Sequence, residues 1–190
     1  MKVRCLLPLL LPVLTASAET YNIDAGRSQI AFTIHQFVSS VRGDFHRFNG
    51  TIEVDREHPE RSSVIVRISV GSIDTRITKR DQHLLSSEFF DAGKFPEIIF
   101  KSRSVKQTGE NSGDILGDFT MHGVTRPMRL HVKLATPAGG DSLPARTRWI
   151  VTTEAINRKD FGLAFGNATE SISGISNSVT PTIEIEAAQK

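Results

Sequence analysis

The fold of this chain is decided by alternating stretches, and the clearest reads Met128-Arg129-Leu130-His131-Val132-Lys133-Leu134. Every second residue is apolar, and the residues between them carry a basic side chain or an imidazole. Successive side chains of a β-strand point to opposite faces. The stretch therefore predicts a strand with one buried face and one face in water, whereas an amphipathic helix would space its apolar residues three and four positions apart.

The same period of two recurs along the rest of the chain. The apolar members of the other runs are Ile30-Phe32-Ile34, Ile52-Val54, Val64-Val66-Ile68-Val70, Ile98-Phe100, Phe119-Met121, Trp149-Val151 and Ile183-Ile185. Turn-forming residues separate the runs, at Ala25-Gly26, Asn49-Gly50, His58-Pro59, Gly109 to Gly113 and Thr136 to Pro144. Roughly eight strands with such loops predict a mainly β domain, either a meandering antiparallel barrel or a sandwich.

One segment, from Ile77 through Phe90, departs from this rhythm. Its apolar residues Ile77, Leu84, Leu85 and Phe89 approximate helical spacing, with charged residues between them. We expect a short amphipathic helix, capped by Asp74 or Thr75 and ended by Gly93 and Pro96. A short helix beside an antiparallel barrel can cover one of its open ends.

Residues 1–18 are expected to be a secretory signal peptide. Lys2 and Arg4 precede an apolar run from Cys5 to Leu14, and Ala16-Ser17-Ala18 follows as a cleavage site. The run is shorter than the roughly 20 residues that cross a bilayer, so no transmembrane segment is expected. Cys5 is the only cysteine in the sequence. The mature protein, residues 19–190, is therefore expected to be a single domain without thiol or disulfide.

Charge argues against a nucleic-acid partner. The whole chain has 23 basic and 21 acidic residues, but removal of Lys2 and Arg4 with the signal peptide leaves the two kinds equal in number. A neutral mature protein exerts no long-range attraction on phosphate. We therefore expect no nucleic acid among its partners.

Several motifs along the mature length resemble those of one known family. They are Tyr21-Asn22-Ile23-Asp24, Ser28-Gln29-Ile30-Ala31-Phe32, Gly43-Asp44-Phe45, Phe48-Asn49-Gly50, Ser72-Ile73-Asp74-Thr75, Arg80-Asp81-Gln82-His83-Leu84, Phe89-Phe90-Asp91, Phe95-Pro96-Glu97-Ile98-Ile99-Phe100, Gly117 to Thr125 and Asn157 to Gly162. In this order and spacing they resemble the YceI-like family of secreted polyisoprenoid-binding proteins. One departure is Arg27, which stands before Ser28 where the family commonly has histidine.

The resemblance implies a fold, a ligand and an assembly. The fold is a lipocalin-like, eight-stranded antiparallel β-barrel with a short α-helix near one mouth. The ligand is a long apolar lipid, a polyisoprenoid such as an isoprenoid quinone or its precursor, held inside the barrel for transport or storage in the periplasm. The assembly is a homodimer.

The residues expected to line the pore are the bulky members of the alternating runs and of the helix. They are Phe32, Ile34, Phe45, Val66, Ile68, Leu84, Leu85, Phe89, Phe90, Phe95, Phe100, Phe119, Leu130 and Trp149. A polar head group would need hydrogen-bonding partners near the mouth, for which Arg80, Asp81 and His83 are the candidates.

No catalytic motif is present, and the six histidines have no spacing that suggests a metal site. We therefore expect no catalytic residue, no metal and no cofactor other than a bound lipid. The alternative is an enzyme or a stress-response redox factor that acts on the bound lipid. A third reading is a barrel with a filled core that acts through outer apolar residues such as Ile65 and Ile99.

Overall fold

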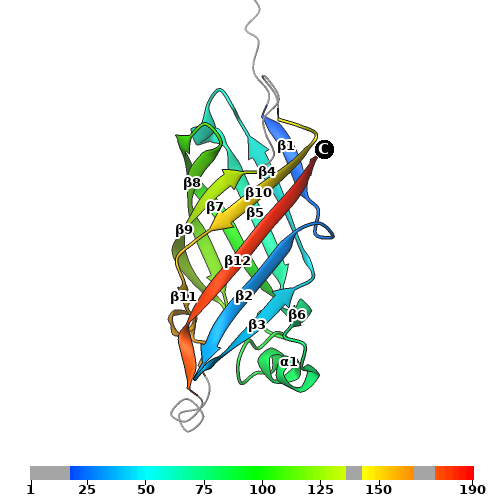
Figure 1. Cartoon of the computed structure of the whole chain (residues 1–190), viewed down its shortest axis with the longest axis vertical. Helices are drawn as coiled ribbons and strands as arrows, with labels where there is room; N and C mark the ends of the chain where they lie inside the picture. Colours follow the sequence, from blue (N-terminus) through cyan, green and yellow to red (C-terminus); the bar gives the residue numbers. More distant parts are fainter. Residues whose placement is uncertain (1–17, 136–142, 165–173) are drawn as a thin grey trace, which may run out of the picture.

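The computed structural model describes residues 18–135, 143–164 and 174–190 (Figure 1). The expected signal peptide, apart from its last residue, lies outside the described residues. Within the described parts, no helix is long and apolar enough to cross a membrane.

The described residues form a closed, eight-stranded antiparallel β-barrel (Figure 1). Its strands follow one another around the ring as β1 (Glu19–Ile23), β4 (Phe48–Val54), β5 (Ser63–Ser69), β7 (Glu97–Gly109), β8 (Ser112–Met121), β9 (Val124–Leu134), β10 (Arg146–Thr152) and β12 (Ile175–Gln189). The ring closes where the end of β12 pairs with β1, through Tyr21 opposite Gln189. The predicted barrel is confirmed, and the sandwich is not the fold.

The long strand β12 has two neighbours on the same edge. Its last residues pair with β1, and its first part, from Ile175 to Glu184, pairs with β2 (Gln29–Gln36). Strand β2 continues into β3 (Ser39–Phe45), which pairs with the short β6 (Ile73–Asp74). These strands extend the barrel wall at the end that carries the helix, where the two-residue strand β11 (Ile156–Asn157) also pairs with β12 (Figure 1).

The side chains of β9 alternate between the barrel interior and the outer face, as the sequence predicted. Leu130 and Val132 line the barrel interior. Arg129 and His131 lie on the outer face, where both contact the carboxylate of Asp114 on β8, His131 through Nδ1 at 2.7 Å. One strand thus separates an apolar interior from a charged exterior, as a half-buried strand requires.

The helix is shorter than the sequence suggested. Helix α1 covers only Thr78–Leu85, and the chain leaves it at Ser86 in an extended conformation. Ile77 occupies the N-cap position without a side-chain cap, so the predicted caps Asp74 and Thr75 were wrong. The reason lies in competing bonds: the Asp74 carboxylate accepts from the backbone N–H of Arg76, and the Thr75 hydroxyl donates to Asp81.

The described residues also contain three short 3₁₀ helices, η1 (Pro59–Arg61), η2 (Val70–Ser72) and η3 (Arg158–Phe161). The predicted turn at Asn49-Gly50 was wrong, because both residues lie inside β4. Gly50 is there because the neighbouring strand passes close: a Cβ atom would lie 2.5 Å from the carbonyl oxygen of Ile65.

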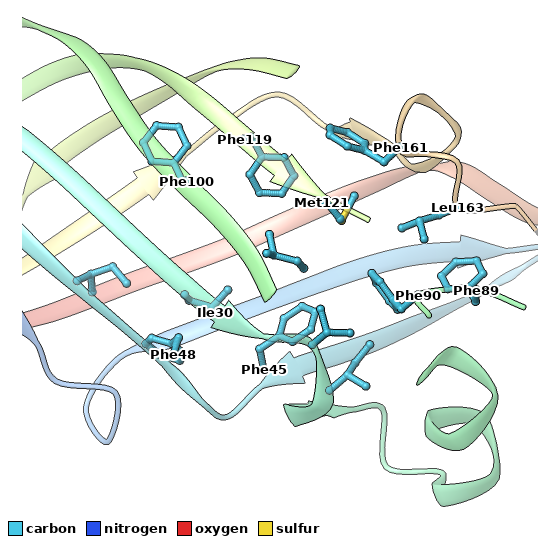
Figure 2. Packing of buried hydrophobic residues seen from close by; sticks show 14 residues of the cluster. Ile30, Phe45, Phe48, Phe89, Phe90, Phe100, Phe119, Met121, Phe161 and Leu163 are labelled. Atoms are coloured by element: carbon cyan, nitrogen blue, oxygen red, sulfur yellow. The ribbon is translucent and has the colours of Figure 1, made fainter. Parts of the chain in front are cut away.

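Aromatic rings pack in the helix half of the barrel (Figure 2). The ring of Phe119 meets that of Phe161 edge-on at 5.4 Å between centroids, and Phe89 meets Phe90 in the same manner at 5.2 Å. Phe89 and Phe90 follow α1 in the chain and belong to the same buried cluster as Phe119 and Phe161 (Figure 2). A second buried cluster, Tyr21, Leu134, Leu143 and Ala187, lies where β1, β10 and β12 meet.

Candidate functional site

One interior cavity occupies the half of the barrel away from α1. It has a volume of about 400 Å³, and we call it the loop-end cavity. Its walls come from β4, β5, β7, β8, β9, β10 and β12, with Val66, Phe100, Leu130 and Trp149 among them. It reaches the barrel end formed by the β4–β5 connection, residues 55–62, and the tip of the β7–β8 hairpin, which together we call the loop mouth.

The second cavity, about 210 Å³, lies under helix α1, and we call it the helix-end cavity. The residues that form its walls come from β2, β3, β6, α1, the segment after α1, and β12. Phe32, Ile34, Phe45, Leu84, Phe89 and Phe90 belong to this wall, which is formed almost entirely by apolar atoms. The helix and the two phenylalanines therefore form a lid of side chains over this end of the barrel.

The two cavities are adjacent and share part of their walls. The shared residues, which we call the waist, are Ile30, Ile68, Phe119, Met128 and Ile183. All five are apolar, so a hydrocarbon chain passing from one cavity to the other would meet no polar side chain at the waist. The two cavities thus adjoin across an apolar partition, and together they leave unfilled space inside the barrel.

Two of the residues expected to line the pore lie elsewhere. Leu85 packs against the core but does not reach either cavity. Phe95 lies against the β8–β9 turn, with its ring 4.7 Å from that of His122. It also occupies the space above Gly123, where a Cβ atom would lie 2.5 Å from the ring. The other predicted lining residues all belong to one cavity wall or the other.

The predicted head-group residues are held by neighbouring groups at the helix end. Arg80 donates from Nε and Nη2 to the hydroxyl and carbonyl oxygens of Thr75, both at 2.7 Å. Asp81 accepts from the backbone N–H and hydroxyl of the same threonine. His83 lies 3.5 Å from the carboxylate of Glu88. Arg80 and His83 line the helix-end cavity, whereas Asp81 does not.

The sequence analysis missed Arg158, which begins η3. Its side chain is 1% exposed and lines the helix-end cavity. Its guanidinium donates to the carbonyl oxygens of Ser176 and Leu163, at 3.1 and 2.7 Å. These bonds fasten η3 to the start of β12, so the arginine closes this end of the barrel. Its position directly before Lys159 gave no periodic signal of burial.

The loop mouth carries polar residues at the end of β7 and in the turn before β8. Gln107 stands two residues after Val105 on β7, and Asn111 stands two residues before Gly113 on β8; all four line the loop-end cavity. Its charged lining residues are Glu53, Asp55, Arg56 and Glu110. The apolar interior therefore ends in a polar rim at the loop mouth, whereas apolar atoms form most of the helix-end wall, to which Arg80, His83 and Arg158 also belong.

Burial and hydrogen bonds shift the pKa values of Tyr21 and Asp114. Burial raises the pKa of the Tyr21 phenol far above its ordinary value, and its hydrogen bond to Glu19 acts in the same direction. On the outer face, hydrogen bonds from His131 and Arg129 lower the pKa of Asp114. In residues 18–135, 143–164 and 174–190, no group of three or more histidine, cysteine, aspartate or glutamate side chains could hold a metal ion.

Comparison with known proteins identifies relatives over nearly the whole length. Residues 21–187 match the family described as YceI-like domain. A protein of Salmonella newport strain SL254 named protein YceI is 35% identical over 179 residues, which cover 93% of this chain and 90% of that protein. A UPF0312 protein of Pseudomonas putida strain GB-1 is 35% identical over 158 residues, 81% of each chain.

Solved structures share the fold. The structure of Burkholderia cenocepacia BcnA matches with a TM-score of 0.78 at 20% identity and covers 87% of this chain and 99% of that one. A domain from Saccharophagus degradans, described as a polyisoprenoid binding domain implicated in plant cell wall breakdown, matches with a TM-score of 0.65 at 17% identity. That match covers 90% of this chain and 98% of the domain.

Proposed function

Because this chain belongs to the YceI-like domain family, we propose that it binds one long apolar lipid of the polyisoprenoid type along the axis of its barrel. The observation that carries the proposal is the adjacency of two apolar cavities, of about 400 and 210 Å³, which share the five apolar waist residues in their walls. The description of the Saccharophagus degradans domain as polyisoprenoid binding adds support.

A slender chain suits this space better than a compact metabolite. An eight-stranded barrel is the size at which the interior holds side chains or one small ligand. Each buried CH₂ group contributes about 0.8 kcal/mol, so a ligand that extends through both cavities gains more than one confined to either. Such a site selects for the length and width of a chain more than for its detailed chemistry.

The same proposal includes the role of the carrier. Residues 1–18 would direct the chain to the periplasm, where a lipid such as an isoprenoid quinone or its precursor cannot cross water unaided. The barrel would shield the hydrocarbon during transport or storage, and the protein would act as a homodimer without chemistry of its own. N-terminal sequencing of the exported protein tests the removal of residues 1–18. Sedimentation equilibrium tests the homodimer.

The central experiment is native mass spectrometry of the mature protein purified without detergent, followed by solvent extraction of whatever is bound. We expect a bound mass that extraction identifies as a long apolar chain. Trp149, the only tryptophan of the chain, lines the loop-end cavity. Its fluorescence then reports rebinding of prenyl compounds to protein from which lipid has been removed.

A matched pair of variants separates the interior from the surface. Leu130→Gln places an amide in the cavity wall, and His131→Gln changes the next residue, which faces outward. We expect the first to weaken retention and the second to leave it unchanged, since burying an amide without a partner costs about 1–3 kcal/mol. A protein that purifies without lipid and gives no Trp149 response to prenyl compounds of any length would contradict the proposal.

A further inference from the structure

The two ends of the barrel differ in the chemistry they offer a ligand. At the helix end, the polar groups of Arg80 and Arg158 donate to acceptors within the protein, and the cavity wall is almost entirely apolar. At the loop mouth, the amide side chains of Gln107, on β7, and Asn111, in the turn before β8, belong to residues that line the loop-end cavity. A lipid has one apolar end and one polar end, and the two ends of this interior match them.

The amides at the loop mouth can both donate and accept hydrogen bonds. They therefore suit a hydroxyl, carbonyl or amide oxygen equally well. The charged residues that line the same cavity are three acids, Glu53, Asp55 and Glu110, and one base, Arg56. An anion placed among them would meet more negative than positive charge, which disfavours a diphosphate.

We propose that the polar end of the lipid lies at the loop mouth, beside Gln107 and Asn111, and that it is an uncharged hydroxyl, carbonyl or amide rather than a diphosphate. The hydrocarbon tail then points past the waist toward α1. This inference rests on the proposed function, because it assigns an orientation and a head-group class to the ligand of that same interior. The head group would then lie at the other end of the barrel from Arg80, Asp81 and His83, the residues expected from the sequence to bind it.

The test uses three probes that share one prenyl chain: farnesol, farnesyl diphosphate and farnesene, which has no polar head. Each is titrated into the full mature chain, freed of lipid, with Trp149 fluorescence as the readout. We expect farnesol to bind more tightly than both others. The variant Gln107→Leu should reduce the preference for farnesol over farnesene by about fivefold, the typical contribution of one hydrogen bond.

Further variants control for position and charge. Lys106→Leu changes a β7 residue that lines neither cavity and should leave the preference for farnesol unchanged, whereas His83→Leu tests the opposite end of the interior. Glu110→Gln removes one negative charge from the loop mouth and should narrow the gap between farnesol and farnesyl diphosphate. Circular dichroism of each variant verifies the fold, which is expected to persist because the substituted residues are all exposed.

The possible outcomes separate this inference from the function beneath it. Tighter binding of farnesyl diphosphate than of farnesol overturns the head-group class. Loss of the farnesol preference in His83→Leu but not in Gln107→Leu overturns the orientation. Equal binding of farnesol and farnesene overturns the inference while lipid binding stands. Failure of all three probes to bind overturns the proposed function itself.

Discussion

Phe32 and Gly43 lie directly opposite each other in the β2–β3 ladder, and the ring of Phe32 occupies the space above the glycine. A Cβ atom at Gly43 would lie 2.3 Å from the tip of that ring. Phe32 also lines the helix-end cavity. The missing side chain at Gly43 thus lets a large aromatic ring lie flat along the barrel wall, where it narrows the cavity least.

The first prediction follows from this contact. Gly43→Ala should lower the free energy of unfolding by about 1–3 kcal/mol, because the ring must leave its position in a packed wall. Urea denaturation monitored by circular dichroism measures the loss. Gly93→Ala is the control, since a Cβ there meets nothing within 4 Å. Phe32→Leu should recover part of the loss in the double variant, and additive effects of the two changes would contradict the explanation.

Arg158 gives the second prediction. Arg158→Leu should lower the free energy of unfolding by about 3 kcal/mol, because two carbonyl oxygens, those of Ser176 and Leu163, lose their donor. Arg158→Lys should restore little, since an ammonium group cannot reproduce the planar fork of a guanidinium. The control is Arg103→Leu, which removes an exposed ion pair with Asp118 and should cost less than about 1 kcal/mol. Equal denaturation midpoints for the two leucine variants would contradict the prediction.

Much of this architecture was predictable from local pattern. The strand around Leu130 appears in the sequence as strict alternation, and the structure places it accordingly. The closure of the barrel was not predictable in this way. It depends on β12, which pairs with both β1 and β2, and pairing between residues as far apart as Tyr21 and Gln189 leaves no mark on local periodicity.

The site divides along the same line. Alternation predicted which residues point inward, but it gives no information on whether inward residues fill the interior or leave a cavity. Phe95 shows the limit most plainly: it belongs to an aromatic-rich motif, yet its ring packs against His122 at a turn. The alternation that begins at Ile98 and Phe100 does not extend to Gln107, because the register of β7 against β8 shifts between Ser102 and Ser104. The sequence pattern therefore did not indicate that Gln107 lines the interior. Tertiary contacts decided both cases.

The third prediction concerns acid stability. A hydrogen bond from the backbone N–H of Arg76, followed by one from His46, lowers the pKa of Asp74 in the folded protein. A carboxyl whose pKa is lower when folded stabilises the protein above its unfolded pKa and loses that contribution as the pH falls through the folded value. The free energy of unfolding should therefore fall as the pH drops below about 4, the ordinary range of an aspartate.

The matched variant for this prediction is Asp74→Asn. The amide oxygen can still accept from the N–H of Arg76, but the side chain no longer titrates. Urea midpoints measured from neutral pH down to pH 3 should fall less steeply for the variant than for the wild type. The difference should be small, because Asp74 is exposed and solvent screens its interactions. Parallel curves for the two proteins would show that Asp74 does not contribute.

The last prediction tests whether one chain passes through both cavities. Ile68 belongs to the waist, and Ile68→Trp should narrow the passage between the cavities. Ile150 lies on β10 with 42% of its surface exposed, so Ile150→Trp adds the same ring outside the barrel.

The readout is the series of prenyl alcohols retained in native mass spectrometry, which a second tryptophan does not disturb. In the wild type and in Ile150→Trp, affinity should rise with chain length, because each further buried CH₂ contributes about 0.8 kcal/mol, roughly fourfold in Kd. In Ile68→Trp the rise should stop at the length that fills the loop-end cavity, while short alcohols bind as before. If the variant retained the longest alcohols as tightly as the wild type, the tail could not lie across the waist, and the ligand would have to occupy one cavity alone.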